Sequence, residues 1–79
     1  MNTKKSDIIP NLERALHLLE YLHQADAPKG VSDVSKALEF PKNTVFRIMN
    51  TLERNGYITR NKKKKYSLSG KISYETAEL

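Results

Sequence analysis

The apolar positions of the chain first repeat with a helical period between Asn11 and His23. Leucine and alanine recur there every three or four residues, which places them along one stripe of a helix. The stripe consists of Leu12, Ala15, Leu16, Leu19 and Leu22. Asn11 is a residue type that caps helices, and the segment 25–30 ends the pattern. We therefore predict a first helix over residues 11–23, after a disordered tail at 1–7.

A second, shorter helical pattern runs from Asp33 to Leu38. Val34, Ala37 and Leu38 are spaced to face inward over about two turns. Ser32 precedes this segment and belongs to the preferred capping residues, while the charge of Asp33 complements the positive end of the helix dipole. We expect Ser32 to be the N-cap of this helix.

A third helix is predicted over about residues 41–55. Pro41 suits a first helical turn, and Asn55-Gly56 is typical of a left-handed C-terminal cap. One face of this helix is apolar and contains Val45, Ile48, Met49 and Leu52. The opposite face is polar, without any acid, and contains Asn43, Arg47, Asn50 and Arg54. The helix is therefore expected to pack on a core with one face and to present amide and guanidinium groups on the other.

After Gly56 the pattern changes from helical to extended. Two short β segments, at 57–59 and 66–68, flank a charged stretch at 60–65, and this order predicts a hairpin. Residues 71–79 have the pattern of the start of a linker helix. The expected fold is mainly α with a small β-hairpin: a winged helix-turn-helix with a three-helix core over residues 8–70.

Length and composition limit the possible functions. A chain of 79 residues holds one small domain, which argues against most enzymes. It has no cysteine, so neither disulfides nor cysteine-bound metals supplement the core. We expect no signal peptide, because Pro10, Glu13 and Arg14 interrupt the apolar stretch near the start, and no run approaches the ~20 apolar residues of a membrane span. These features agree with a cytoplasmic protein.

The positive charge is concentrated in one half of the chain. The net charge is +5, but residues 1–40 carry 5 basic and 6 acidic side chains, whereas residues 41–79 carry 9 and 3. Between Pro41 and Lys71 the only acid is Glu53. A basic half on a small domain favours a polyanionic partner, nucleic acid before an anionic membrane surface.

The polar face of the third helix matches the chemistry that reads DNA. A helix fits the major groove, where arginine pairs with guanine and asparagine with adenine. Thr44 and Thr51 flank that face and are expected to reach a phosphate or a thymine methyl group. The alternative is a merely solvated face, but such faces usually carry Glu and Lys rather than Asn and Arg.

Four consecutive lysines, Lys62, Lys63, Lys64 and Lys65, lie at the predicted hairpin tip. Such a run suits a wing that lies along phosphates, and the alternative is a solvated tip. Ser32 is a further candidate for a phosphate contact, although capping alone is the simpler role.

Catalysis and metal binding find no support. His17 and His23 lie six residues apart on one helix and point in different directions, so they cannot share a metal ion; we expect His23 to be half-buried and His17 solvated. The three glycines are too scattered for a phosphate-binding loop, and no cofactor is predicted. Phe40 and Phe46 are expected to pack in the core or the turn rather than to stack on bases.

Several segments together resemble the N-terminal DNA-binding domain of the IclR family of bacterial transcriptional regulators, over roughly residues 8–79. The most specific are Arg-Ala-Leu-x-Leu-Leu at 14–19, Pro-Lys-x-Thr-Val-x-Arg at 41–47 and Leu-Glu-x-x-Gly-Tyr at 52–57. Weaker matches complete the series: 31–38, 56–58 and 66–68. The resemblance implies a protein that binds double-stranded DNA and is not an enzyme.

Carried onto this chain, the resemblance makes Lys42, Asn43, Thr44 and Arg47 contacts at the start of the recognition helix, with Ser32 and the lysine wing on the backbone. Two departures matter. The family commonly has Arg-Leu-Gly after the wing tyrosine, where this chain has Ser67-Leu68-Ser69-Gly70. Family members also continue into an effector-binding domain, so this chain is expected to be an N-terminal fragment that binds DNA without sensing an effector.

The resemblance also implies dimers, and we expect a weak homodimer on a palindromic operator. Leu18 and Tyr21 lie off the predicted stripe, and with Ile72 they are the expected dimer contacts. The alternative is that they are ordinary scattered exposed residues. A different function, a winged helix that docks onto protein or RNA in an assembly, would require large exposed apolar groups on the third helix.

Overall fold

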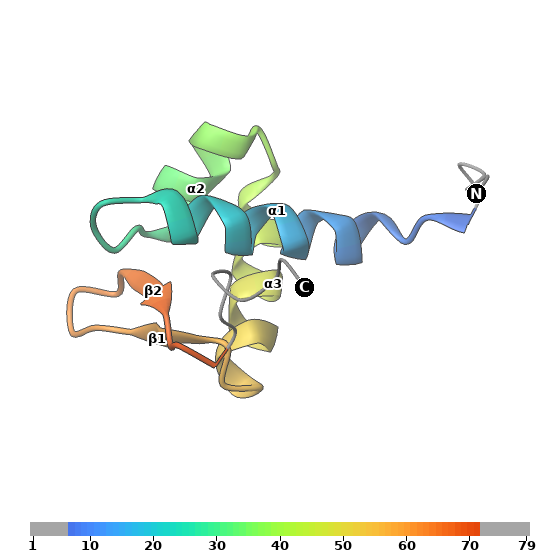
Figure 1. The fold of residues 1–79 in the computed structure, drawn as a ribbon. Coiled ribbons are helices and arrows are strands. Elements are labelled where there is room, and N and C mark those ends of the chain that lie inside the picture. The colour runs from blue at the N-terminus through green and yellow to red at the C-terminus, as the bar shows by residue number, and fades with distance from the viewer. Residues whose placement is uncertain (1–6, 72–79) are drawn as a thin grey trace.

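The structure is a computed structural model that describes residues 7–71. Three helices precede a two-stranded antiparallel hairpin, which confirms the predicted fold class. The elements are α1 (Pro10–Gln24), α2 (Val31–Leu38), α3 (Lys42–Arg54), β1 (Ile58–Arg60) and β2 (Tyr66–Leu68). In Figure 1, α1 runs across the molecule and its first turns extend beyond the other elements. The predicted tail and linker helix lie almost entirely outside the described residues.

Every element contributes to one apolar core. Its buried members are Leu18, Leu19, Leu22, Val34, Val45, Ile48, Met49, Ile58 and Tyr66. Ala15, Tyr21, Val31, Leu38, Phe40, Leu52, Tyr57 and Leu68 pack partly buried against them. The predicted inner face of the third helix is thus confirmed. Because the core joins α1, α2 and α3 with both strands, it fixes the third helix relative to the wing.

The predicted inner face of the first helix is partly wrong. Leu18 is fully buried, whereas Leu12 and Leu16 are 55% and 52% exposed. The first turns of α1 extend past the elements that would cover them (Figure 1). Leucine occurs on more than one face of this helix, and packing of its C-terminal half against α2, α3 and β2 selects the face that contains Leu18.

Helix N-termini also differ from the predictions. α1 begins at Pro10 with Ile9 as N-cap, not Asn11, because the fixed φ of proline suits the first helical position and the N–H it lacks has no partner within a helix there. α2 begins at Val31 with Gly30 as N-cap, so Ser32 lies inside the first turn and does not cap. The Asp33 carboxylate instead accepts the Gly30 N–H at 3.0 Å.

Two more expectations, for side chains near the C-terminal ends of α2 and α1, are wrong. Ala37 is exposed instead of facing inward, because α2 is covered only on the side of Val34 and Leu38. His23 is exposed rather than half-buried, because in the last turn of α1 the neighbouring Leu22 occupies the side that faces the core.

The turn between α2 and α3 is held by local hydrogen bonds. The Ser35 hydroxyl donates to the Phe40 carbonyl at 2.6 Å, and the Phe40 N–H donates to the Ser35 carbonyl at 3.2 Å. Glu39 lies between them in the left-handed region, with a φ of 59°. α3 then starts at Lys42, one residue after the predicted position, with Pro41 as its N-cap.

Gly56 ends α3 as predicted. Its φ is +85°, its N–H donates to the Glu53 carbonyl, and the Tyr57 N–H donates to the Leu52 carbonyl at 2.9 Å. These two bonds form a Schellman motif, in which a left-handed residue satisfies the last carbonyls of a helix. The chain thereby turns from α3 directly into β1.

The hairpin pairs Ile58 with Leu68 and Arg60 with Tyr66. β1 begins one residue later than predicted. On the side of β2 away from β1, Tyr66 forms an antiparallel bridge with Lys29. The Lys29 N–H donates to the Tyr66 carbonyl at 2.9 Å, and the Tyr66 N–H donates to the Lys29 carbonyl at 2.7 Å. The wing is thus attached to the segment that leads into α2.

Candidate nucleic-acid interface

The polar face of α3 is exposed to solvent as the sequence predicts. Asn43, Arg47, Asn50 and Arg54 are all exposed, and Lys42 is exposed at the first position of the helix. They lie opposite the buried side chains that anchor α3 to the core. A rigid helix with an acid-free polar face can present several hydrogen-bond donors to base edges at once.

The two threonines on one flank of this face differ. Thr44 is partly buried, and the exposed Thr51 donates its hydroxyl to the Arg47 carbonyl at 2.8 Å, so its proton is already used within the helix. A phosphate can only accept hydrogen bonds, so the Thr51 hydroxyl would have to give up this bond to donate to one.

Phe46 lies beside the polar face and is 50% exposed, so the expectation that it packs in the core is wrong. Phe40 does pack against the core and also lies under the Arg14 guanidinium, 5.7 Å from the ring centroid. Helical spacing places Phe46 at i+3 from Asn43 and i−4 from Asn50, and sequence patterning alone did not identify it as a candidate contact.

The wing tip is shaped by Asn61. Its side-chain oxygen accepts the N–H groups of Lys63 and Lys65 at 2.9 and 3.0 Å, and its carbonyl accepts the Lys64 N–H at 3.0 Å. Lys64 adopts a φ of 62°. The ammonium groups of Lys62, Lys63 and Lys64 make no hydrogen bond or ion pair within residues 7–71, and these three side chains are exposed.

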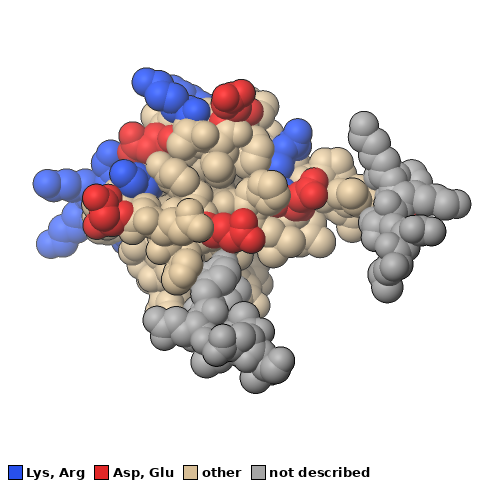
Figure 2. Space-filling model, turned by 45° about the horizontal axis from the view of Figure 1, so that its top comes forward, with Lys and Arg blue, Asp and Glu red and all other residues tan. Residues whose placement is uncertain are grey.

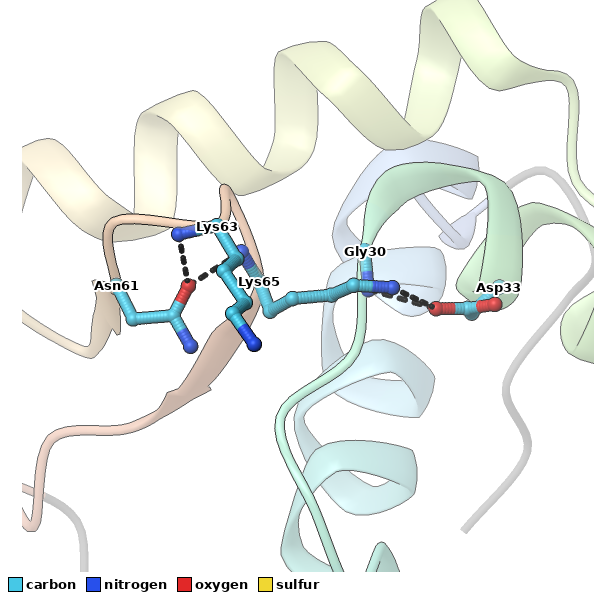
Figure 3. Close-up of polar contacts among 5 residues, drawn as sticks. All are labelled: Gly30, Asp33, Asn61, Lys63 and Lys65. Atoms are coloured by element: carbon cyan, nitrogen blue, oxygen red, sulfur yellow. Dashed lines mark hydrogen bonds and ion pairs between the residues drawn. The ribbon is translucent and has the colours of Figure 1, made fainter.

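Lys65 differs from the other three lysines. Its ammonium lies 3.2 Å from the Asp33 carboxylate, which also accepts the Gly30 N–H (Figure 3). The Gly30 hydrogen bond lowers the pKa of Asp33, and the nearby Lys65 lowers it further. The lysine run therefore does not act as one uniform tip.

In the view of Figure 2 most of the visible Lys and Arg side chains lie at the left, the side from which the hairpin projects in Figure 1, and others lie at the top and right of centre among acidic side chains. Ser32, exposed in the first turn of α2, follows the segment that bridges to the wing. Ser32, the face of α3 and the wing thus belong to elements that the core holds in a fixed arrangement.

The predicted dimer contacts are not all available. Leu18 is 0% exposed and belongs to the core, so its prediction as a dimer contact is wrong. Tyr21 is only partly exposed and packs against the core, and Ile72 lies outside the described residues. A groove of about 410 Å³ lies between α1 and α3, and its lining combines apolar side chains such as Leu12 with polar ones such as Arg47.

Residues 7–71 contain neither a group of metal ligands nor a membrane-spanning helix. Among residues 7–71 no three histidine, cysteine or acidic side chains are grouped as metal ligands would be. None of the helices in that range is long and apolar enough to cross a membrane.

Comparison with known proteins gives a consistent result. The model of the IclR helix-turn-helix domain matches residues 11–62. The chain is 33% identical over 66 residues to the HTH-type transcriptional regulator XynR of Escherichia coli, covering 82% of this chain and 26% of that protein. It is 40% identical over 47 residues to the probable transcriptional regulator SauR of Cupriavidus necator, covering 60% and 19%.

The fold also matches solved structures. An IclR family transcriptional regulator from Brucella abortus aligns with a TM-score of 0.76 at 24% identity, over 87% of this chain and 27% of that one. A regulator from Alicyclobacillus acidocaldarius aligns with a TM-score of 0.74 at 23% identity, over 78% and 26%. The chain therefore matches only about a quarter of the length of XynR and a smaller share of SauR. With the family model covering most of its length, this chain belongs to the IclR helix-turn-helix domain family.

Proposed function

We propose that this chain binds double-stranded DNA in a sequence-specific manner, with α3 in the major groove and the wing on the backbone. The observation that carries the proposal is the exposed, acid-free face of α3 opposite its buried face. Guanidinium and amide groups on one rigid surface are the groups that distinguish guanine and adenine in that groove.

Within this proposal the side chains of α3 have separate roles. Arg47 reads a guanine, and Asn43 and Asn50 read adenines. Phe46 contributes an apolar contact to a thymine methyl group. The remaining predicted contacts, which position the helix on the DNA backbone, are Lys42, Thr44, Thr51 and Arg54.

The wing supplies sequence-independent affinity. Lys62, Lys63 and Lys64 project from a hairpin tip and have no competing acid within the described residues. Each phosphate that a lysine neutralises releases counterions, so these contacts make binding depend on salt. Ser32 at the start of α2 adds a neutral backbone contact.

At the level of the whole protein, we propose the DNA-binding part of a bacterial transcriptional regulator that acts in the cytoplasm. The relatives are named as transcriptional regulators, which supports a regulatory rather than an enzymatic role. An effector-binding domain accounts for the much greater length of those relatives. DNA is then the partner of this chain, and a small effector is the partner of the other domain.

We also propose a weak homodimer on a palindromic site, with a revised contact surface. Leu12 and Leu16 on the first half of α1 are exposed where Leu18 is not. A two-fold pair through this surface would present two α3 helices to successive major grooves. Analytical ultracentrifugation with and without a palindromic duplex tests this. A complex with one chain per full palindrome at saturating protein would contradict the proposed dimer. The contact surface would be contradicted if the variant Leu12→Ser still bound the palindrome with two chains as the original does.

The function itself is tested by selection of random duplexes on the purified chain, followed by fluorescence anisotropy on the selected site. We expect one enriched motif and tighter binding to it than to a shuffled duplex or to single-stranded RNA of the same sequence. Equal affinity for all three would contradict sequence-specific DNA binding. A preference for RNA would instead favour an RNA-docking module.

A further inference from the structure

Lys65 is structurally distinct within the lysine run at 62–65. It is partly buried, whereas the other three lysines are exposed. A Cβ atom added at Gly30 would lie 3.5 Å from the Lys65 Cδ atom, so the aliphatic part of Lys65 crosses the N-terminus of α2. Its ammonium ends 3.2 Å from the Asp33 Oδ2 atom (Figure 3).

Both partners of this ion pair are held in place by the backbone around them. The Lys65 N–H donates to Asn61 Oδ1, and the Lys65 carbonyl accepts the Asn61 N–H at 2.9 Å. The next residue, Tyr66, is bonded on both backbone groups to Lys29. Asp33 is fixed by its bond to the Gly30 N–H at 3.0 Å. The pair therefore loses less side-chain freedom than two unrestrained surface residues would.

The ion pair changes the charge that the protein presents to DNA where the wing lies beside the N-terminus of α2. The N-terminus of α2 and the wing are both elements that the proposed function places beside phosphates. A phosphate that approaches Lys65 also approaches the Asp33 carboxylate, and the two charges cancel. A neutral pair releases no counterion on binding, in contrast to the three free lysines of the tip.

We propose that Asp33 keeps Lys65 from acting as a phosphate contact, so that the wing presents three lysines to DNA rather than four. Asp33 is in this sense a positioning residue for the wing. The proposal rests on the proposed function. Because a backbone contact strengthens binding to every sequence, an acid that limits such contacts lowers the affinity for all DNA and its dependence on salt.

The substitution Asp33→Asn separates charge from structure. The amide oxygen of the substituted side chain can still accept the Gly30 N–H, so the start of α2 is retained, which an unchanged far-ultraviolet circular dichroism spectrum of the folded variant verifies. The double variant Asp33→Asn with Lys65→Gln has the net charge of the original chain, but both side chains at this place are neutral and form no ion pair. Glu20→Gln, on the exposed side of α1, is the control for loss of one acid that takes no part in this pair.

Affinity for a short labelled duplex of mixed sequence is measured by fluorescence anisotropy over a range of salt concentrations. For Asp33→Asn we expect tighter binding and a slope of log affinity against log salt steeper by about 0.9, the value for one added phosphate contact. Between about 50 and 200 mM salt its affinity would then fall about 3.5-fold more than that of the original chain. The double variant and Glu20→Gln are expected to keep the original slope.

Two results would overturn the proposal. If the salt slope of Asp33→Asn equals that of the original chain, Lys65 gains no phosphate contact. If the double variant is as steep as Asp33→Asn, the gain comes from loss of the acid and not from Lys65. The variant Lys63→Gln distinguishes these from failure of the proposed function. If the original chain shows no salt-dependent affinity and Lys63→Gln changes nothing, the wing does not bind DNA and both proposals fail.

Discussion

The orientation of α1 can be tested by removing one buried and one exposed leucine from the same helix. Leu18 is 0% exposed and surrounded by core residues of the other elements, whereas Leu16 is 52% exposed. Truncation of a fully buried leucine to alanine lowers the free energy of unfolding by about 3 to 5 kcal/mol, because the protein loses the transfer free energy of the deleted atoms and is left with a cavity. Half-exposed Leu16 loses at most about 1 kcal/mol, because only half of its transfer energy is at stake.

These values are large relative to the whole domain. A chain of this size has about 5 kcal/mol of net stability, so Leu18→Ala removes most of it. With a urea dependence of about 1 kcal/mol per molar, the unfolding midpoint should fall by about 3 M or more for Leu18→Ala and by about 1 M or less for Leu16→Ala.

The measurement is urea unfolding followed by far-ultraviolet circular dichroism on both variants and the original chain. Both variants delete the same atoms from the same helix, so helix propensity affects them alike. Equal midpoints, or a larger loss for Leu16→Ala, would refute the burial of Leu18 and favour the stripe that periodicity predicts.

Three further predictions concern the interface and the fold. Arg47→Ala should cost about 1 to 3 kcal/mol on the selected site and much less on shuffled DNA, measured by anisotropy at one salt concentration; equal losses would mean that Arg47 only contacts phosphate. Gly56→Ala should destabilise the chain by about 1 kcal/mol in urea, because its φ of +85° is disfavoured once a Cβ is present, and an unchanged midpoint would contradict the left-handed cap. The lowered pKa of Asp33 means that its ionised form stabilises the fold above the ordinary pKa of about 4, and that this contribution is lost as the pH falls through the lower folded-state pKa. The melting temperatures of the original chain and Asp33→Asn should therefore converge in acid, and a constant difference across that range would contradict the prediction.

The elements and the polar face of α3 follow from local sequence. The third helix has four apolar residues on one face and amide or guanidinium groups on the opposite face, so one orientation buries that apolar set and leaves only Phe46 exposed beside the polar face. Gly56 ends it because a left-handed residue is required at that position. Both features depend on residues within a few turns of each other, which is the range over which periodicity is informative.

The rotation of α1 and the state of Lys65 were decided only by tertiary structure. Leucines lie on more than one face of α1, so periodicity did not define a unique buried face, and contact with α2, α3 and β2 selected the one with Leu18. Lys65 meets Asp33 across 32 positions of sequence, through the bridge between Lys29 and Tyr66. A lysine run looks uniform along the chain, and only the three-dimensional position of an acid separates one charge from its neighbours.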